Sequence, residues 1–595
     1  MANRIPLIVH ATHEAGLKVG GIGAVLDGIL RTERYWKSVD RTILAGPMNG
    51  ADSVEMERLT APGSNLQIGY SSLHGIFDQV TEEQRAALQQ VEQTFEVALL
   101  YARRRFGAYE AEVILVDATS PNPELANSFK YHVWEAYGID SARYDWNPEF
   151  NRYFSSAQPL FSGLKAIGAD SGLEAGQKCI IAHEWLGLPS VFAAQLNEPG
   201  GWRTIFYAHE TASARRLVEE HSGHDTRFYN TMSKAQEWGL HLEAIFGNQD
   251  DFFKDPLIRQ ATRCDNIFAV GDLVVEELRF LGGDFAQANI DLVYNGIPAV
   301  DLSLAEKMVS RDRLQRYCET LLGYRPDYVF THVTRLVLSK ALWRDIRVLE
   351  HLDEMLGREG KQAVLFVLST SVPAGRRPEW VEAWEDQYGW PLQHRADNGD
   401  LIGQETSYFF EGVEPFNRRA ANCQVVFVNQ FGWSRDRCGR RMPDDMDFMD
   451  IRKGSDLEFG QSIYEPFGIA QVEPLSFGTL CCVSNVCGCI GFADRVAGGL
   501  QNLPNLIVAD YVSLPDTYRL NSPYDALWID RNTRDWIESS SSAAVAQTIF
   551  DSLPRDESEL QTLLTRGHEV ARGMSWDVVV RDYLLPGIDK AMESQ

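Results

Sequence analysis

Two carboxylates lie on either side of a glycine in the last third of the chain: Glu465 precedes Gly468, and Glu473 follows it. We expect a helix to open at Gly468, so that main-chain N–H groups at its start could bind a phosphate. Carboxylate oxygens accept charge-assisted hydrogen bonds, and they therefore suit the hydroxyl groups of a sugar. The same pattern also fits a capped helix that leaves Glu473 in solvent.

Two cations, Arg335 and Lys340, follow the apolar run Val329–Val333. Positive charge at the C-terminal end of a strand could neutralise a diphosphate as it leaves a reacting centre. An ordinary solvated pair of cations is the alternative interpretation of these two residues.

A glycine-rich turn that contains Lys18, Gly20 and Gly21 follows the first apolar run, Ile5–Val9. Glycines in such a turn let the backbone approach a phosphate closely. The dinucleotide-binding fingerprint GxGxxG fails here, because Leu26 stands where its third glycine belongs, which argues against a dehydrogenase. A plain structural turn stays open as the alternative.

Two histidines close strand-like runs: His183, which Glu184 follows, and His209. Neither segment contains HExxH, which excludes a zinc protease of that type. The four cysteines between positions 481 and 489 contain no CxxC pair, which favours small buried residues over a zinc or redox site. Histidines at strand ends favour a ligand crevice, because ligands of α/β domains collect beyond the carboxyl ends of the strands.

Composition excludes several classes of protein. The chain has 595 residues, of which 44% are hydrophobic and 23% charged, so it can bury a sizeable core. Its formal net charge of −27 makes nucleic acids and anionic membranes poor partners. No apolar run approaches the roughly 18 residues that a membrane span needs. Its 9 cysteines are sparse and odd in number, unlike a secreted disulfide framework, so we expect a cytoplasmic protein.

Short apolar runs alternate with helical patterns along most of the chain. Such alternation predicts parallel sheets that helices cover on both faces. The runs are too many for one sheet, so two α/β domains are expected, with a boundary at the turn Asn295–Pro298. The strand-like runs are Ile5–Val9, Val113–Val116, Cys179–Ala182, Thr204–Tyr207, Asn266–Val270, Val329–Val333, Val364–Leu368, Val425–Val428 and Leu480–Ser484, and the helical ones include Glu82–Arg105, Leu186–Gln195, Asp272–Leu281, Leu342–Leu356 and Ser541–Leu553.

Two stretches have the composition of insertions, Ser369–Ser407 and Phe431–Ser455. The second mixes charges of both signs, which is typical of a solvated surface loop. The alternative is a loop that shapes an acceptor groove or a subunit contact, so a homo-oligomer stays open.

Taken together, these features resemble the retaining glycosyltransferases of the GT-B architecture. The resemblance is greatest to the glycogen and starch synthases and, among them, to the eukaryotic-type glycogen synthases. It extends over nearly the whole chain. The matching segments are Lys18–Gly21, His183–Trp185, His209, Asn295–Gly296, Arg335, Lys340, Glu465, Glu473 and Ser575–Asp577.

The resemblance implies an α/β GT-B fold with two Rossmann-like domains that face a central cleft. It implies an N-terminal acceptor-side domain over 1–298 and a C-terminal nucleotide-sugar-binding domain over 299–574. A C-terminal helix over 575–595 would return to the N-terminal domain. One departure is Pro474, which lies inside the helix expected after Gly468 and would kink it.

The resemblance also implies roles for single residues. The main-chain carbonyl of His209 would stabilise charge on the transferring sugar, Arg335 and Lys340 would hold the departing diphosphate, and Glu465 would accept sugar hydroxyls. These four positions form the catalytic set. The donor-binding positions would be Lys18, Gly20, Gly21, Asn295, Phe467, Gly468, Ile469 and Glu473, and the acceptor-side positions His183 and Glu184.

The implied reaction moves glucose from a nucleotide diphosphate glucose, UDP- or ADP-glucose, to the non-reducing end of an α-1,4-glucan with retention of configuration. No metal ion and no cofactor would be required, because cationic side chains and main-chain amides supply the positive potential. The partners would be the nucleotide-sugar donor and a glucan or oligosaccharide acceptor. Two alternatives stay open: a related transferase with a small sugar or sugar-phosphate acceptor, and an inactive glucan-binding scaffold.

Overall fold

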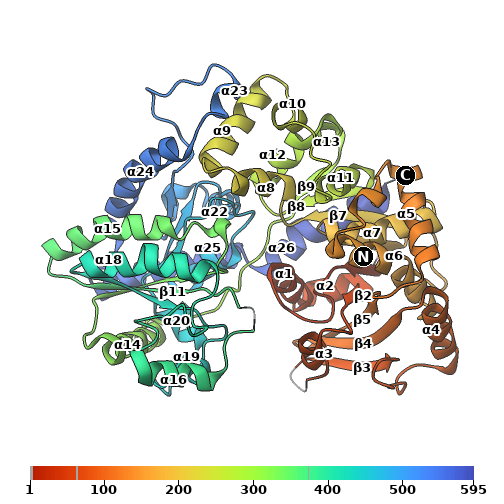
Figure 1. The fold of residues 1–595 in the computed structure, drawn as a ribbon, viewed down its shortest axis with the longest axis horizontal. Helices are drawn as coiled ribbons and strands as arrows, with labels where there is room; N and C mark the ends of the chain where they lie inside the picture. Colours follow the sequence, from red (N-terminus) through yellow and green to blue (C-terminus); the bar gives the residue numbers. More distant parts are fainter. Residues whose placement is uncertain (1–3, 62–63, 373, 595) are drawn as a thin grey trace. The chain divides into compact units, whose positions relative to one another are not determined.

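The computed structural model describes residues 4–61, 64–372 and 374–594. The chain forms two compact units (Figure 1). The first consists of Met1–Ser213, Leu240–Gly296 and Trp576–Gln595, and the second of Ala214–Gly239 and Ile297–Ser575. The chain therefore passes between the units more than once.

The segment Ala214–Gly239 differs from the domain assignment made from the sequence, which placed all of 1–298 in the N-terminal domain. Its main helix, α9 (His224–Glu237), is bonded to residues of the second unit that lie far along the chain. Thr226 Oγ1 donates to the Tyr511 carbonyl at 2.8 Å, and Asn230 Nδ2 donates to the Val512 carbonyl at 2.8 Å. Hydrogen bonds between residues nearly 300 positions apart cannot be predicted from the local sequence pattern.

The C-terminal helix α27 (Leu585–Glu593) belongs to the first unit, as the resemblance implies. It packs against strands β7 and β8 of that unit. The Asn266 side-chain amide donates to the Gly587 carbonyl at 3.0 Å, and a Cβ on Gly587 would lie 2.6 Å from the Phe268 ring. A glycine at this position therefore lets the helix approach the sheet closely.

The first unit contains a nine-stranded sheet in the order β3-β4-β5-β2-β1-β6-β7-β8-β9. Only β4 runs antiparallel to its neighbours. Chain order reverses between β1 and β6, and such a reversal is where ligands bind in open α/β sheets. The strands are β1 (Ile5–Ala11), β2 (Val39–Met48), β3 (Leu66–Ser71), β4 (Ala98–Phe106), β5 (Tyr109–Asp117), β6 (Lys178–His183), β7 (Arg203–Ala208), β8 (Asn266–Ala269) and β9 (Ile290–Leu292).

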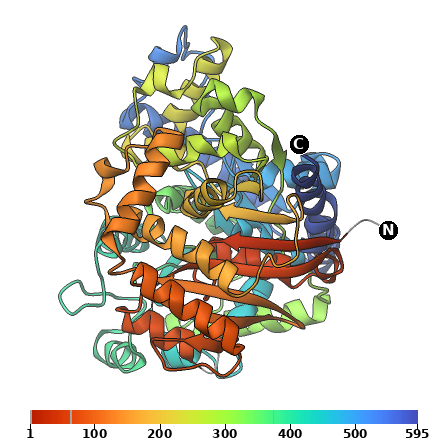
Figure 2. The ribbon, with the colours of Figure 1, turned by 90° about the vertical axis from the view of Figure 1, so that its right-hand side faces the viewer.

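Helices cover this sheet, and α6 packs on β5 and β2 (Figure 2). The long helix expected over Glu82–Arg105 is wrong in its second half: α4 ends at Phe95, Glu96 turns left-handed with φ 54°, and the chain continues as β4. The helices of the first unit are α1 (Gly21–Leu30), α2 (Glu33–Ser38), α3 (Ser53–Thr60), α4 (Glu82–Phe95), α5 (Pro123–Tyr137), α6 (Pro148–Ala166), α7 (Leu188–Asn197), α10 (Leu242–Phe246), α11 (Lys254–Arg259), α12 (Asp272–Leu281), α13 (Gly283–Gln287), α26 (Trp576–Val579) and α27, and α8 (Ala212–Glu220) starts at its boundary.

The second unit contains a six-stranded, wholly parallel sheet in the order β12-β11-β10-β13-β14-β15. Chain order reverses between β10 and β13, as in a doubly wound nucleotide-binding fold. The strands are β10 (Tyr328–Val333), β11 (Ala363–Leu368), β12 (Cys423–Val428), β13 (Leu457–Gly460), β14 (Leu480–Ser484) and β15 (Leu506–Ala509).

Successive strand residues of this sheet enter two different cores. Val329 and Val364 pack into the cluster on one face, whereas Phe330 and Leu365 pack into the cluster on the other. Since side chains alternate across a strand, a strand buried on both faces is mostly apolar, as β11 is over Ala363–Leu368. The polar exceptions are hydrogen-bonded: Thr331 to Glu458, and His332 to Asp345.

Helices flank both faces of the second sheet. The two segments expected to be insertions, Ser369–Ser407 and Phe431–Ser455, also contain helices. The stretch Phe431–Ser455 is solvated in part, as its charges predicted: Asp436, Arg437, Arg440, Asp444, Asp445 and Asp447 are exposed, whereas Asp450 and Arg452 are buried. The helices are α9, α14 (Leu304–Leu322), α15 (Trp343–Arg358), α16 (Pro378–Tyr388), α17 (Gln404–Ser407), α18 (Glu414–Arg419), α19 (Arg435–Cys438), α20 (Phe448–Gly454), α21 (Ile469–Val472), α22 (Cys489–Ala497), α23 (Pro523–Ala526), α24 (Arg531–Ser552) and α25 (Glu557–Gly573). Among the described residues, no helix combines the length and the apolar character needed to cross a membrane.

Candidate active site

The reversal point of the second sheet carries three of the four residues expected in the catalytic set. Arg335 and Lys340 follow β10, and Glu465 follows β13, the neighbouring strand. The Lys340 ammonium donates to Glu465 Oε2, so residues 125 positions apart meet in one ion pair. The Lys340 side chain is 14% exposed and that of Glu465 9% exposed, whereas Arg335 is exposed. The structure thus brings Lys340 and Glu465 together at the edge where ligands bind.

Gly468 occupies a position that only glycine fits. Its φ is +87°, and an added Cβ would lie 2.8 Å from Cys487 Sγ and 2.9 Å from Gln471 Oε1. The preceding carbonyl, that of Phe467, accepts from the Cys489 amide at 2.9 Å. Close packing beneath this turn fixes the direction of the amides that follow Gly468.

Glu473 lies in a different element from the one expected. The helix after Gly468 is a single turn, α21, and a 3₁₀ turn over Glu473–Phe477 follows it. Pro474 stands in the first turn of that 3₁₀ segment, where no N–H is needed, and so the proline ends α21 rather than kinking a longer helix.

The Glu473 carboxylate is held by a residue that the sequence analysis missed. Arg452 Nη2, from α20, lies 3.4 Å from Glu473 Oε2, and Arg452 Nη1 lies 3.0 Å from Glu458 Oε2. The Arg452 side chain is 1% exposed. No local signal marked it, because it stands in a stretch of alternating charges.

In the first unit, a buried carboxylate folds the glycine turn. Glu14 Oε2 accepts from the Val19 and Gly20 amides, each at 2.6 Å. The Gly20 amide, expected to bind a donor phosphate, is therefore already bonded. Gly21 opens α1 and has no atom within 4 Å of the place of a Cβ, and Lys18 pairs with Asp27 at 3.2 Å.

Glu184 holds the loop that contains His209. Its Oε1 accepts from the His209 amide at 2.5 Å and from the Glu210 amide at 2.8 Å, and its Oε2 has no partner among the described residues. Burial, with the charge of Glu210, raises the pKa of Glu184 to about 8. Its backbone, at φ 66° and ψ 177°, occupies a region that is nearly confined to glycine. Such strain persists where the surroundings fix it, and it is common at functional sites.

The His209 ring ends a buried chain of hydrogen bonds. His209 Nε2 lies 2.9 Å from His183 Nδ1, and His183 Nε2 lies 2.9 Å from His10 Nδ1. His10 Nε2 then reaches the Tyr35 hydroxyl at 3.1 Å, which lies 3.1 Å from Thr42 Oγ1. Burial lowers the pKa of His10 and of His209 to about 3, so the rings are neutral. Each neutral ring donates once and accepts once, and the whole chain therefore runs in one direction.

His183 and Glu184 do not present the acceptor-side surface that the resemblance implied. His183 is fully buried and Glu184 is 4% exposed. Both contact the His209 loop, His183 through its ring and Glu184 through its carboxylate. Their geometry therefore fits a positioning role. Asn295 is also buried, at the end of the last segment of the first unit before Gly296.

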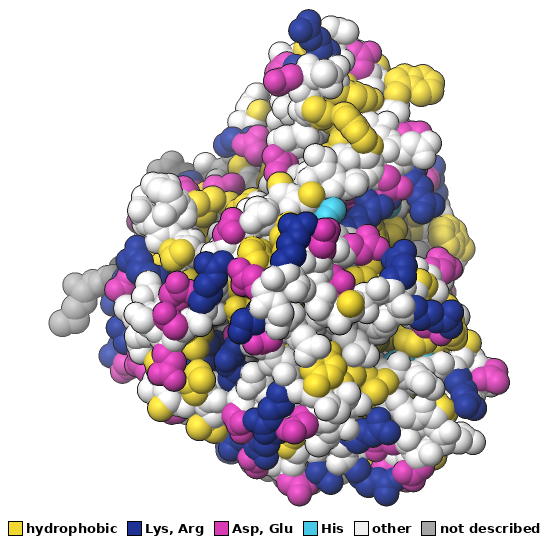
Figure 3. Space-filling model, turned by 90° about the vertical axis from the view of Figure 1, so that its left-hand side faces the viewer, with side chains coloured by type: hydrophobic (Ala, Val, Ile, Leu, Met, Phe, Trp, Pro, Cys, Tyr) yellow, Lys and Arg dark blue, Asp and Glu magenta, His cyan; other side chains and the backbone are white. Residues whose placement is uncertain are grey.

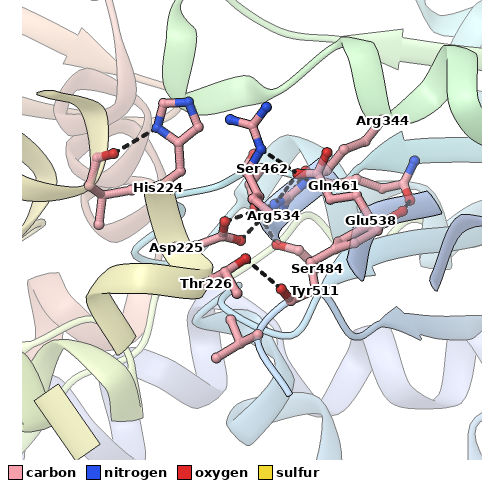
Figure 4. A network of polar contacts seen from close by, with 12 residues as sticks. His224, Asp225, Thr226, Arg344, Gln461, Ser462, Ser484, Tyr511, Arg534 and Glu538 are labelled. Carbon is pink, nitrogen blue, oxygen red and sulfur yellow. Dashed lines mark hydrogen bonds and ion pairs between the residues drawn. The ribbon is translucent and has the colours of Figure 1, made fainter. Parts of the chain in front are cut away.

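Behind Glu465, the second unit contains a buried ionic cluster centred on Arg344 (Figure 4). The guanidinium makes a two-bond contact with Asp225, at 2.8 and 2.9 Å, and donates to Glu538 at 2.9 Å. It also donates to the carbonyls of Gln461 and Ser462, each at 3.2 Å. One side chain therefore joins α9, α24 and the loop that leads to Glu465.

The four cysteines of the second unit's segment 481–489 lie on β14 and at or just before the start of α22. Cys481, Cys482, Cys487 and Cys489 are buried free thiols, and Cys487 Sγ lies 3.3 Å from Cys489 Sγ. Among the residues that the structure describes, no group of three or more His, Cys, Asp or Glu side chains is arranged to hold a metal ion.

Comparisons with known proteins bear on the fold. No protein-family model matches the chain, and no curated protein matches it. One similar solved structure, from E. coli, is described as trehalose-6-phosphate bound with UDP-2-fluoro glucose; it is 12% identical over 99% of each chain, with a TM-score of 0.50. Another, the catalytic domain of starch synthase IV from Arabidopsis thaliana bound to ADP and acarbose, is 13% identical over 99% of this chain and 100% of that one, with a TM-score of 0.50.

The fold is that of the GT-B glycosyltransferases. The expectation of two Rossmann-like domains is therefore confirmed. Ligand sites in such sheets lie at the reversal points, and here these points carry the Lys340–Glu465 pair in one unit and the Glu14 and Glu184 turns in the other.

Two of the residues that sequence analysis missed did carry a signal. Glu14 stands directly before the glycine turn, and a lone acidic residue there is a candidate acceptor for the turn's amides. His10 is a single polar residue in the otherwise apolar strand β1, which marks a buried polar group in need of a partner.

Proposed function

We propose that the protein is a retaining glycosyltransferase that moves glucose from a nucleotide diphosphate glucose to the non-reducing end of an α-1,4-glucan. The observation that carries this proposal is the Lys340–Glu465 pair at the reversal point of the parallel sheet in the second unit. A cation suited to phosphate and a carboxylate suited to hydroxyl groups stand side by side there, as a sugar diphosphate requires.

The cations bind the diphosphate in this proposal. Lys340 uses one N–H bond on Glu465, which leaves its other donors for phosphate oxygens. The exposed guanidinium of Arg335 can make a two-bond contact with two further phosphate oxygens. No metal ion or cofactor takes part, because fixed positive charge stabilises the leaving group directly.

The carboxylates bind the two sugars of the donor. Glu465 orients hydroxyl groups of the transferring glucose, and the amides after Gly468 bind that sugar or its phosphate. Glu473 binds the ribose, and Arg452 holds its carboxylate in place from behind. Glu465 is thus an orienting group and not a covalent nucleophile.

The chemical step breaks the bond between the glucose C1 and the phosphate oxygen and forms a bond from C1 to the acceptor oxygen on the same face of the sugar. The departing phosphate takes the acceptor's proton. For the first unit, the resemblance implies that the main-chain carbonyl of His209 stabilises charge on the sugar and that Lys18 contacts the donor phosphates. The direction of the His209 carbonyl is fixed within its own unit by the two amide bonds to Glu184.

The descriptions of the similar structures support a nucleotide-sugar donor and leave two acceptor classes. One contains UDP-2-fluoro glucose and names trehalose-6-phosphate, and the other contains ADP and acarbose. Acarbose, an oligosaccharide, favours the glucan acceptor. The phosphorylated sugar favours a second candidate, transfer of glucose to a small sugar phosphate.

The decisive experiment measures nucleotide diphosphate release from UDP-glucose and ADP-glucose with glycogen, a maltooligosaccharide or a hexose phosphate as acceptor. Faster release with the glucans supports the first candidate, and faster release with the hexose phosphate supports the second. Tight glucan binding without release from either donor would establish a scaffold and overturn the proposal.

Variants test the site itself. Glu465→Ala should reduce transfer by roughly 100-fold or more, since a donor misplaced by about 1 Å loses that much rate. Glu382→Ala, an exposed carboxylate on α16, is the matched control and should retain the wild-type rate. Near-normal transfer by Glu465→Ala with unchanged donor binding would show that the assignment is wrong.

A further inference from the structure

The first unit contains a cavity of about 400 Å³ beside the glycine turn. Its charged lining residues are Lys18, Asp27, Arg31, Arg58, Arg104 and Arg105. Five of these side chains are cationic and one is anionic, in a chain whose net charge is −27. On the face drawn in Figure 3, by contrast, basic and acidic side chains are interspersed.

The single carboxylate of the lining is shared between two cations. Asp27 accepts from Arg31 at 2.8 Å and lies 3.2 Å from the Lys18 ammonium. Burial acts to raise the pKa of Asp27, but the bonds from Arg31 and the charge of Lys18 outweigh it and lower that pKa. Asp27 therefore stays ionised, and its one charge leaves the lining with an excess of positive charge.

Arg104 is the buried member of the set, 5% exposed. Its Nη1 donates to the carbonyls of Glu14 and Ala15, at 2.7 and 2.9 Å, and its guanidinium lies 4.9 Å from the centre of the Phe106 ring. These partners are uncharged, and burial lowers the pKa of Arg104. A buried cation without a bonded carboxylate gains most from an anion placed beside it.

Arg58 and Arg105 are exposed at the opening of the cavity. The nearest carboxylate recorded for Arg105 is that of Glu110, at 4.0 Å, too long for a good hydrogen bond. Guanidinium groups recognise phosphate oxygens in a two-bond geometry, and a cavity with four arginines in its lining suits a dianion.

We propose that this cavity binds a phosphate dianion, either as free phosphate or as the phosphate group of a small sugar. Its volume lies within the range of small-molecule sites, and five of its lining residues are cationic and can supply charge-assisted donors. The Lys340–Glu465 pair belongs to the other unit, but Lys18 lines this cavity and is also proposed to contact the donor phosphates, so every variant used to test the cavity leaves Lys18 unchanged. The inference does not depend on transferase activity. Arg104 donates to the main-chain carbonyl of Glu14, and the Glu14 carboxylate accepts from the Gly20 amide of the glycine turn. An anion bound to Arg104 would therefore be linked to the glycine turn through Glu14.

Calorimetric titration of the full-length protein at low ionic strength tests this proposal. The probes are inorganic phosphate, a hexose 6-phosphate and the uncharged hexose. The wild type should bind both phosphates and not the hexose. Equal affinity for the two phosphates would show that the phosphate alone is recognised, and tighter binding of the hexose 6-phosphate that the sugar contributes; either result supports the site.

Two variants locate the binding. The double variant Arg58→Ala/Arg105→Ala should weaken phosphate binding by about tenfold or more, the loss expected when two charge-assisted contacts disappear. Arg279→Ala, an exposed arginine of the same unit on α12, should leave the affinity unchanged. If the double variant unfolds, Arg58→Gln replaces it with an expected loss of about threefold or more.

Lys340→Ala separates this site from the proposed donor site. Phosphate binding in the cavity should survive that substitution, whereas loss of binding would place the phosphate at the donor site and overturn the proposal. The proposal also fails if the wild type takes up neither phosphate, or if the double variant binds them as tightly as the wild type.

Discussion

Each unit contains a polar network near the reversal point of its sheet. The network of the first unit is neutral, whereas that of the second is ionic. In the first unit, His209, His183 and His10 form a chain of neutral rings that ends on hydroxyl groups. In the second, Arg344 sits between the carboxylates of Asp225 and Glu538. A neutral chain fixes the direction of each N–H bond, whereas an ionic cluster fixes the positions of the segments that supply its charges. The first suits the orientation of a single loop, and the second suits the joining of distant parts of the chain.

The difference extends to the other buried histidines. In the second unit, His332 bonds to Asp345 at 2.6 Å and His394 bonds to Asp400 at 3.1 Å. Each of these rings is therefore hydrogen-bonded to a carboxylate. The three histidines of the first-unit chain bond only to one another and to a hydroxyl. His224, also buried in the second unit, bonds to the Val218 carbonyl, and burial lowers its pKa to about 4. Acid should therefore act on both units, and more strongly on the first, whose chain contains three such histidines.

The largest effect is expected from Arg344→Met. The substitution leaves the carboxylates of Asp225 and Glu538 buried without their main partner, and breaking a buried ion pair in this way costs about 3–5 kcal/mol. Urea unfolding should show that loss as a lower midpoint. Arg358→Met, on the same helix but 71% exposed, should change stability by less than about 0.5 kcal/mol. Equal midpoints for the two variants would show that the cluster contributes nothing.

Acid separates the two networks more sharply. The pKa of His10 and of His209 is lowered to about 3 in the folded state, so the unfolded chain binds protons that the folded chain does not. Stability is therefore complete above the unfolded pKa near 6.5 and falls as pH drops toward 3, by about 2–3 kcal/mol per histidine at pH 4.5. Amide hydrogen exchange at pH 4.5 should show lower protection in β1 and β6 than in β10 and β11, relative to pH 7. Equal losses in both sheets would contradict this prediction.

The Glu184 carboxyl gives the opposite pH dependence within the first unit. Its pKa is raised to about 8, so the folded state binds that proton more tightly than the unfolded chain does. Stability is then greatest below the unfolded pKa and is lost as pH rises to the folded pKa near 8, by about 3–4 kcal/mol between pH 5 and pH 8. Glu184→Gln removes this slope, because an amide does not titrate. Urea unfolding at both pH values measures it, with the exposed Glu57→Gln as a control that should keep the wild-type slope.

Sequence reasoning succeeded where a residue's neighbours along the chain decide its place. Lys340 follows β10 and Glu465 follows β13, and parallel strands bring their carboxyl ends to one edge. The meeting of the two residues follows from that rule and from the adjacency of β10 and β13. Strands and helices that alternate along the chain predicted two α/β domains in the same way, and the GT-B architecture was implied by the resemblance.

Sequence reasoning failed where a partner that is distant in the sequence decides the structure of a segment. The residues of β4 suit a helix as well as a strand, and pairing with β5 settles the choice. The docking of α9 on the second unit depends on Arg344, and the orientation of Glu473 on Arg452. Arg344 bonds to Asp225 and Glu538, 119 and 194 positions away, and Arg452 contacts Glu473, 21 positions away. Nothing in the local pattern of charges distinguishes these two arginines from solvated residues.

The smallest effect should come from the far end of the neutral chain. Tyr35→Phe removes the hydroxyl that lies between His10 Nε2 and Thr42 Oγ1, and a buried ring nitrogen without a partner costs about 1–2 kcal/mol. Tyr109→Phe, on the strand β5 of the same sheet, is the matched control, because no hydrogen bond of its hydroxyl is recorded among the described residues. The substitution also affects the direction of the hydrogen bonds between the histidine rings. Because His10 Nε2 loses its partner, the rings can adopt either set of tautomers. NMR of the histidine ring nitrogens should then show one set of tautomers in the wild type and a mixture in Tyr35→Phe; an unchanged spectrum would show that the direction is set at His209 and not at Tyr35.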